Sequence, residues 1–444
     1  MIKRTINAKF EELSLPLVIQ QDVSAVVPTI KGTPFLKYGQ HAYYFFNFKM
    51  QRGLRVTLGH KEVILPGVKR FFKSASRASG RFPFIESLFR RYHNNFNFLE
   101  QIMLMTVPHA VTPLKNGCFL INLWSYFGYL EVDCRNRTVT YNMLDKDDDG
   151  QVLGSQQFYD AEKNERYYVT YSLRDSYKRA TITESPVSCR ISKQDRNIDA
   201  VSEVWSGDFV DYIHDIVVNK TRQYCVVPEL GMLEDRNGGI IPSKVLVVDM
   251  KNKRSWVISK FSVAAHAQFD PDEPDIIYFS SHNFMFRHSN ILKLLKNAIY
   301  DVEFKGPAAV HKYELTPEGP RKLAEFSSPD FFRLTNFHVF NHRGQKIIAA
   351  ISSPNYIFII AADNMELVKK ISVNHERTAK SFFKQIPSVV GTISPSIDGE
   401  KIFVQTNRSF QVVDVASGKA DTVLNHYHNH TCANHMITSS DVEW

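Results

Sequence analysis

Five histidines begin similar segments along the chain, and imidazole is the commonest metal ligand among protein side chains. In four of the segments a polar or turn-forming stretch follows the histidine and leads into an apolar run, as in HAQFDPDEPDIIYF. The fifth segment ends with the chain. The histidines are His109, His214, His266, His338 and His435. Their recurrence predicts a repeated structural unit in which several imidazoles converge.

Converging imidazoles would form a metal centre. Three or four neutral imidazoles can hold Fe(II), Mn(II) or Zn(II) and leave positions open for substrate, and we expect Fe2+ or Mn2+ before Zn2+. Carboxylates orient such ligands by accepting the other ring N–H. Asp215, Asp270 and Glu443 stand near the histidines in sequence, and His282 is an alternative ligand or a substrate contact.

Each of these histidines also has a purely structural interpretation, since a histidine at a strand start is often just hydrogen-bonded. The tail HYHNHTCANH also has two interpretations. It is either a local metal site or a loop that happens to be rich in histidine. Its candidate ligands are His426, His428, His430 and Cys432.

A second motif, DKDDDG, matches the first half of a calcium loop. Its carboxylates are Asp145, Asp147 and Asp149, but Gln156 stands where a bidentate Glu is expected. Calcium binding is therefore the alternative, and a solvated acidic turn is the main interpretation.

The elements that would position the histidines are short strands separated by turns. Several units end in an apolar strand, an Asp, a polar turn and another strand, as in VLVVDMKNKRSWVI and FQVVDVASGKADTVL. This ending is typical of the outer hairpin of a β-propeller blade.

The spacing of the histidines predicts how many blades there are. The intervals 109–214 and 338–435 are each about twice a propeller repeat of about 40–50 residues, so each contains a blade without a histidine. Gln156 and Gly391 take the histidine position there. We therefore expect an all-β, seven-bladed propeller that spans 1–444 as one domain. Strands in HAYYFFNFKM, GLRVTLG and KEVIL would share the last blade with the C-terminal strand and close the ring.

Two segments have helical periodicity instead. Residues 68–105 predict a helical cap or lid, and residues 288–302 predict a second insertion within the long interval after His266. Within the first, basic and Phe residues interleave over 69–91. This favours a solvated basic face, with peripheral membrane contact as the alternative. Nucleic acid is not expected, because no nucleic-acid fold pattern accompanies the charge.

The composition of the chain excludes several classes of protein. The chain has 444 residues, a net charge of +8, 43% hydrophobic residues and five scattered cysteines without a CxxC pair. This excludes a disulfide framework and a zinc ribbon. The N-terminus lacks a signal-peptide pattern and no apolar run is long enough to cross a bilayer, so we expect a cytoplasmic protein. The oligomeric state stays open.

Two short segments resemble known families. YIHDIVV (212–218) resembles the His-Asp strand entry of carotenoid cleavage oxygenases, which are seven-bladed propellers with four His on a non-heme iron. That resemblance implies His109, His214, His266 and His338, or His435, as iron ligands. HAQFDP (266–271) is similar to an element of oligogalacturonate lyases, which hold a divalent metal with His and Gln. It implies that Gln268 contacts metal or substrate. Each resemblance covers only a short part of the chain, and the other motifs of these families are not reproduced.

The leading hypothesis is a metal-dependent oxygenase, lyase or isomerase acting on a small substrate. The 32 Phe and 19 Tyr favour an apolar substrate. The sequence contains no G-x-S-x-G, P-loop, G-x-G-x-x-G or H-E-x-x-H motif, but a Ser–His–Asp triad needs no such spacing. The rival hypothesis is a non-catalytic propeller that binds a protein or peptide.

Overall fold

A computed structural model of the chain describes residues in a series of segments with gaps between them. The described residues are 2–14, 25–30, 40–47, 52–59, 108–123, 128–144, 151–172, 187–209, 215–229, 243–261, 263–282, 284–288, 300–304, 307–331, 334–352, 356–373, 390–406, 409–425 and 436–439.

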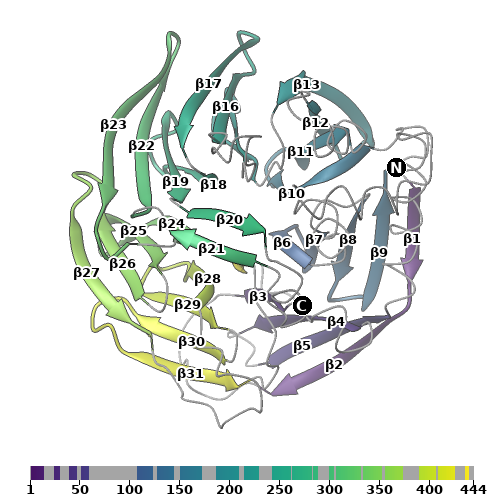
Figure 1. Cartoon of the computed structure of the whole chain (residues 1–444). Helices are drawn as coiled ribbons and strands as arrows, with labels where there is room; N and C mark the ends of the chain where they lie inside the picture. The colour runs from purple at the N-terminus through teal and green to yellow at the C-terminus, as the bar shows by residue number, and fades with distance from the viewer. Residues whose placement is uncertain are drawn as a thin grey trace.

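The described strands form eight antiparallel sheets, and seven of these are arranged radially, like the blades of a propeller (Figure 1). Blade 1 contains, from the axis outward, β6 (Pro108–Pro113), β7 (Cys118–Leu123), β8 (Gly128–Asp133), β9 (Thr138–Met143) and β1 (Ile2–Ile6). Blade 2 contains β10 (Gln151–Asp160), β11 (Glu165–Ser172), β12 (Val187–Asp195) and β13 (Ala200–Phe209). Blade 3 contains β14 (Val217–Val218), β15 (Tyr224–Pro228), β16 (Ser243–Asp249) and β17 (Arg254–Phe261).

The next three blades repeat this pattern. Blade 4 contains β18 (Val263–Phe269), β19 (Ile276–His282), β22 (Ala309–Thr316) and β23 (Gly319–Ser327). Blade 5 contains β24 (Leu334–His342), β25 (Gln345–Ser352), β26 (Tyr356–Ala361) and β27 (Leu367–Ser372). Blade 6 contains β28 (Val390–Pro395), β29 (Lys401–Thr406), β30 (Ser409–Asp414) and β31 (Ala420–Asn425).

Blade 7 closes the ring with strands from both ends of the chain. It contains β32 (Met436–Ser439), β3 (Ala25–Ile30), β4 (Gln40–Asn47), β5 (Arg52–Gly59) and β2 (Ala8–Ser14). The innermost strands contact one another in the order β6, β10, β14, β18, β24, β28, β32 and back to β6. The expectation of an all-β, seven-bladed propeller is confirmed.

The N-terminal segment differs from expectation. Its two strands serve two blades, because β1 is the fifth strand of blade 1 and β2 is the fifth strand of blade 7. Of the predicted closing strands, HAYYFFNFKM and GLRVTLG correspond to β4 and β5. KEVIL (61–65) lies outside the described residues, and β3 and β2 supply the other N-terminal strands.

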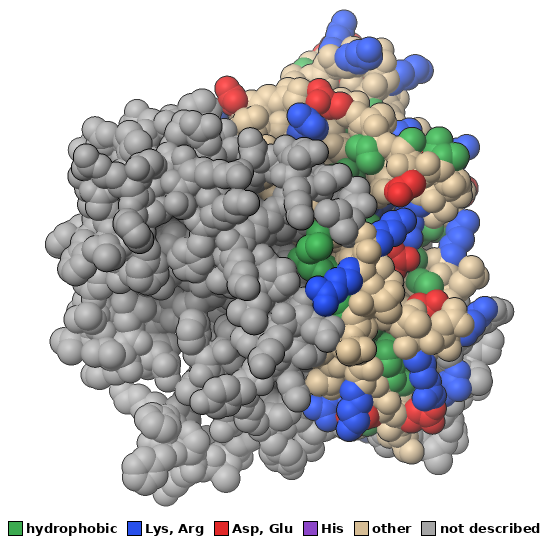
Figure 2. Space-filling view, turned by 90° about the vertical axis from the view of Figure 1, so that its right-hand side faces the viewer, with side chains coloured by type: hydrophobic (Ala, Val, Ile, Leu, Met, Phe, Trp, Pro, Cys, Tyr) green, Lys and Arg blue, Asp and Glu red, His purple; other side chains and the backbone are tan. Residues whose placement is uncertain are grey.

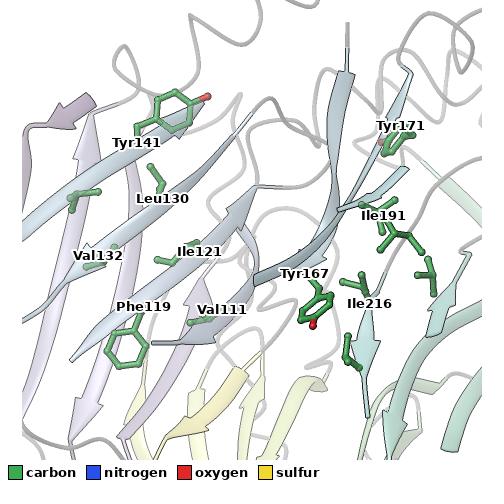
Figure 3. Packing of buried hydrophobic residues seen from close by; sticks show 14 of the residues in the cluster. Val111, Phe119, Ile121, Leu130, Val132, Tyr141, Tyr167, Tyr171, Ile191 and Ile216 are labelled. Atoms are coloured by element: carbon green, nitrogen blue, oxygen red, sulfur yellow. The ribbon is translucent and has the colours of Figure 1, made fainter. Parts of the chain in front are cut away.

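The core lies between neighbouring blades. One large cluster links blades 7, 1, 2 and 3, and Figure 3 shows part of it packed between facing strands. Aromatic pairs connect blade 7 to both neighbours: Phe45 packs on Phe119 and Phe46 on Phe410, each with ring centroids 5.0 Å apart. Fully burying such a side chain contributes about 1.5–3 kcal/mol, so these contacts reinforce ring closure.

The outer hairpins follow the expected strand–Asp–turn–strand pattern. The Asp133 and Asp249 carboxylates accept hydrogen bonds from the backbone N–H of Asn136 and Asn252, at 2.8 and 2.9 Å. The next residues, Arg137 and Lys253, have positive φ angles of 53° and 54°. The aspartates therefore shape the turns between strands three and four of these blades.

The predicted insertions require one correction. Residues 68–105 lie outside the described residues. The second insertion does fall within blade 4, between β19 and β22, but its described ends form an antiparallel hairpin of β20 (Phe284–His288) and β21 (Tyr300–Phe304). His288 and residues 300–302 are therefore strand instead of helix, because cross-strand pairing outweighs the helical periodicity of the local sequence.

Charges of both signs cover the described part of the face in Figure 2, interspersed with single hydrophobic side chains. Ion pairs such as Lys3–Asp199 (3.6 Å) and Arg137–Glu12 lie at the surface, where each contributes less than about 1 kcal/mol. A helix long and apolar enough to cross a membrane does not occur in the described part of the chain.

Candidate metal centre and a polar cluster in blade 4

The predicted histidine positions lie on or beside innermost strands. His266 belongs to β18 and His338 to β24, which are neighbours in the ring. His109 belongs to β6, although its side chain is outside the description. His214 and His435 are outside the described residues, and each directly precedes a described segment that contains an innermost strand. The blade repeat therefore accounts for their recurrence.

His266 is buried beside a carboxylate of the preceding blade. It is 7% exposed, and its Nδ1 lies 3.8 Å from Oδ2 of Asp215. Its backbone N–H donates to the Ser280 hydroxyl at 3.0 Å. Asp215 is itself buried, and its carboxylate accepts the N–H groups of Ile216 (2.8 Å) and Ala267 (3.2 Å). A buried carboxyl group thus lies near the imidazole, as expected for a residue that orients a ligand.

His338 presents an unpaired ring nitrogen. Burial, together with the smaller effect of the nearby His266, lowers its pKa to about 4, although a hydrogen bond to the Ile393 backbone opposes the shift. The buried Nε2 has no hydrogen-bond partner among the described residues, so Nδ1 makes the bond to Ile393. At neutral pH this imidazole is uncharged and its Nε2 can offer a lone pair to a metal.

Polar side chains on the inner strands also connect consecutive blades. The Thr112 hydroxyl donates to the Gln157 carbonyl at 3.1 Å, from blade 1 to blade 2. The amide of Gln268 donates to the Val339 carbonyl at 3.0 Å and accepts the Val339 N–H at 2.9 Å, from blade 4 to blade 5. Gln268, expected as a metal or substrate contact, therefore also has a structural role that the sequence did not indicate.

Asp270 occupies a turn instead of the channel wall. Its carboxylate accepts the N–H groups of Asp272 (2.9 Å) and Glu273 (3.0 Å), the Tyr278 hydroxyl (3.2 Å) and the Lys346 ammonium of blade 5 (2.8 Å). The contact with Lys346 makes Asp270 part of another link between blades 4 and 5.

The histidines do not share one register. His266 lies within a register irregularity between Ala264 and Ala267, whereas His338 follows the corresponding irregularity in β24 and pairs with Ala349. His109 lies within the irregularity of β6. These bulges change which way a side chain points, so equal spacing in sequence does not produce equivalent positions around the axis.

The other predicted positions are described only in part. Gln156 and Gly391 lie on innermost strands β10 and β28, as expected for blades that lack the histidine. His282 pairs with Val263 at the end of β19, and its side chain is not described. The calcium-loop residues Asp145, Asp147 and Asp149, the tail 426–435, the basic segment 69–91 and Glu443 lie outside the described residues.

The described residues supply an incomplete ligand set. Within them, no three His, Cys, Asp or Glu side chains gather closely enough to hold a metal. His266 and the unpaired His338 Nε2 suit two coordination positions. His109 belongs to β6 of blade 1, and in sequence His214 and His435 directly precede the described segments that contain β14 and β32.

Blade 4 contains a polar cluster that sequence reasoning did not find. The Ser281 hydroxyl lies 2.8 Å from His311 Nε2, and His311 Nδ1 lies 3.2 Å from Oε2 of Glu325. The three residues come from β19, β22 and β23. Their separation in sequence carries no motif, and they come together through the pairing of β19 with β22 and of His311 with Glu325.

Comparisons with known proteins add fold likeness alone. No family model and no curated protein matches the chain, so neither family resemblance has support from a matching family. Similar solved structures include a candidate 6-phosphogluconolactonase from Bacteroides fragilis (9% identity, TM-score 0.48, 94% of this chain and 98% of that chain). Another is Raptor from Chaetomium thermophilum (12% identity, TM-score 0.46, 80% of this chain and 28% of that chain). Both are too distant to assign a chemistry.

Proposed function

We propose that this propeller is a metal-dependent enzyme that holds a divalent transition metal on the inner strands of blades 4 and 5. His266 and His338 would be ligands, and His109, His214 and His435 are the candidates for the remaining positions. Fe2+ or Mn2+ is expected before Zn2+. Imidazole alone does not distinguish between these metals. The bound metal would act as a Lewis acid or activate oxygen.

The observation that carries the proposal is the buried, unpaired Nε2 of His338. A buried polar atom without a partner costs about 1–3 kcal/mol, so a native structure usually satisfies it. The bond to Ile393 holds the ring through its other nitrogen. Metal-ligating histidines commonly have this arrangement, because the second hydrogen bond fixes the tautomer and the ring orientation.

The residues of this chain would bind and orient the metal and its substrate. Asp215 would align the His266 ring through its nearby carboxylate. Gln268 would hold β18 against β24, because its amide hydrogen-bonds both backbone groups of Val339. We propose a small apolar substrate, an assignment that rests on the aromatic-rich composition alone.

Cobalt substitution tests the site directly. Metal-stripped protein would be titrated with Co2+, whose visible spectrum reports coordination by protein ligands. We expect saturation at one equivalent for the wild type and at least about tenfold weaker binding for His338→Ala. His342→Ala is the matched control, because His342 lies in the same strand but its Nδ1 contacts the Gly399 carbonyl at 2.9 Å. Equal titrations for all three proteins would refute the assignment.

The rival hypothesis, a protein-interaction scaffold, lacks a specific observation in its favour. The exposed large hydrophobic residues of the described chain are distributed over several blades, including Val201 on β13, Val257 on β17 and Val368 on β27. Single exposed apolar residues are normal on a protein surface. A scaffold would bind no metal and would tolerate loss of the histidines.

A further inference from the structure

Ser281, His311 and Glu325 lie on three adjacent strands of blade 4 in the order of a catalytic triad. The Ser281 hydroxyl is 2.8 Å from His311 Nε2, which is within hydrogen-bond reach. On the other side of the ring, His311 Nδ1 is 3.2 Å from Oε2 of Glu325 in a bent contact. His311 and Glu325 are direct cross-strand partners, so the backbone register itself holds them together.

The surroundings of His311 select the tautomer that catalysis would need. Because the Glu325 carboxylate faces Nδ1, a proton on Nδ1 is favoured and Nε2 keeps its lone pair for the Ser281 hydroxyl. Burial lowers the pKa of His311 to about 4, although Glu325 opposes this shift. The ring is therefore neutral at physiological pH. Lys322 Nζ anchors Glu325 at 2.6 Å.

Buried aromatic contacts connect this cluster to Tyr313, which lines a groove between blades 3 and 4. The His311 ring packs against Phe261 and Phe279, with centroids 5.0 and 5.2 Å away. Phe279 in turn packs on Tyr313 at 4.9 Å. Tyr313 and Lys322 line a groove of about 980 Å³ whose other walls include Trp256.

Gly319 keeps one end of the groove open. Its φ angle is +129°, and a Cβ at this position would lie 3.0 Å from Trp256 Nε1. A side chain here would strain the backbone and crowd the indole. The groove thus combines an apolar floor with the charged ends of Arg321 and Lys322, which suits a small molecule with an aromatic or aliphatic body.

We propose that Ser281, His311 and Glu325 form a serine-esterase site, separate from the histidine centre, for small carboxylic esters with an apolar body. The Ser281 oxygen would attack the ester carbonyl carbon while its proton moves to His311 Nε2. The carbonyl–alkoxy bond then breaks, and the proton passes from His311 to the departing alkoxide, which leaves as an alcohol.

Water completes the cycle. It attacks the acyl-Ser281 carbonyl and gives one proton to His311, and the bond to the Ser281 oxygen breaks. His311 then returns the proton to that oxygen, so that ester and water become acid and alcohol without an oxidant or reductant. Glu325 is a positioning residue, because it acts through the His311 ring and touches no reacting atom.

Two probes test the site, p-nitrophenyl butyrate and an aryl-reporter fluorophosphonate, both used on full-length protein in excess EDTA. We expect the phosphonate to modify Ser281, which peptide mass spectrometry would locate. We expect p-nitrophenyl butyrate to be hydrolysed to p-nitrophenol and butyrate. Ser281→Ala should abolish both reactions. Ser206→Ala is the control, since that serine lies on β13 and bonds the exposed Glu203 at 2.7 Å.

Further variants separate catalysis from folding. His311→Gln should lower the hydrolysis rate about 100-fold or more, the range of a lost general base. Glu325→Gln should lower kcat with little change in KM and with an unchanged melting temperature. Labelling at another residue, no labelling of the folded protein, or hydrolysis that persists in folded Ser281→Ala would each overturn the proposal. EDTA keeps this outcome independent of the metal site.

Discussion

His338 and His311 are both buried imidazoles whose pKa falls to about 4, mainly because burial disfavours the charged ring. Their surroundings nevertheless differ. Nε2 of His338 has no partner among the described residues, whereas Nε2 of His311 contacts the Ser281 hydroxyl. An unpaired imidazole nitrogen suits a metal, and a nitrogen bonded to a hydroxyl suits proton transfer. The same residue type therefore supports two different proposals.

The lowered pKa of His311 predicts acid sensitivity. The unfolded ring has an ordinary pKa of about 6.5, so between that pH and about pH 4 the unfolded state binds more protons than the folded state. Stability is complete above pH 6.5 and falls as the pH drops toward 4, by at most about 3 kcal/mol for this ring.

Urea unfolding of wild type and His311→Gln at several pH values checks this prediction. Gln keeps a hydrogen-bonding group beside Ser281 but does not titrate, so the variant should lose less stability between pH 7 and pH 4. Glu325 and Lys322 face the ring and also bear charge. A Glu325→Gln variant measures how much of the pH dependence of the unfolding free energy comes from this carboxylate. Identical pH profiles for wild type and His311→Gln would rule out the lowered pKa of His311.

The strand on which a residue lies could be predicted from the sequence more readily than the contacts of its side chain. The recurrence of histidines predicted positions at the start of blades, and His109, His266 and His338 lie on the inner strands β6, β18 and β24. Ser281 and His311 could not be paired in this way, because β20 and β21 intervene between their strands. Their contact follows from the pairing of β19 with β22, which no local pattern encodes.

At the scale of elements, the inner strands both present candidate ligands and hold the blades together. Thr112, Asp215 and Gln268 each hydrogen-bond the backbone of the inner strand in the next blade. Such bonds satisfy backbone groups of strands that would otherwise meet neighbours only through side chains. The metal proposal depends on this architecture, since it sets the spacing between β18 and β24.

Gln268→Leu tests the strongest of these links. It removes two hydrogen bonds and leaves the N–H and C=O of Val339 without the Gln268 partner, so we expect a loss of about 2–4 kcal/mol in unfolding free energy. Chemical denaturation measures this loss. Gln345→Leu, at an exposed position of β25, should change stability far less. Equal effects would mean that the Gln268 link adds nothing.

Register explains why the elements were easier to predict than the site. Alternating apolar residues and Asp-containing turns identified the strands and the outer hairpins. The irregularities between Ala264 and Ala267 and between Leu334 and Phe337 have no equivalent signal in the sequence. They change the register of the strand, so His266 lies within one irregularity and His338 follows the other.

At the scale of the whole molecule, the ring is closed by pairing between the two ends of the chain. β32 lies innermost in blade 7 and pairs with β3, with Met436 opposite Pro28 and Ile437 opposite Val27. Closure buries the edges that an open series of sheets would expose. The use of β1 and β2 in two different blades was not foreseen, because both strands are short and polar on one face.

Truncation tests closure. A chain ending at residue 435 lacks β32 and should melt at a clearly lower temperature or aggregate, because β3 and the inner strands β28 and β6 lose their neighbour. A chain ending at residue 439 keeps β32 and is the control. Differential scanning calorimetry compares the two, and equal melting temperatures would contradict closure through β32.

The central claim is that the inner strands of blades 4 and 5 bind a transition metal. Its most direct test is metal analysis by inductively coupled plasma mass spectrometry, on protein purified without chelators and after reconstitution with Fe2+ or Mn2+. We predict close to one equivalent in the wild type and in His342→Ala, and almost none in folded His266→Ala/His338→Ala. A metal-free wild type after reconstitution, or an unchanged metal content in the double variant, would contradict the account.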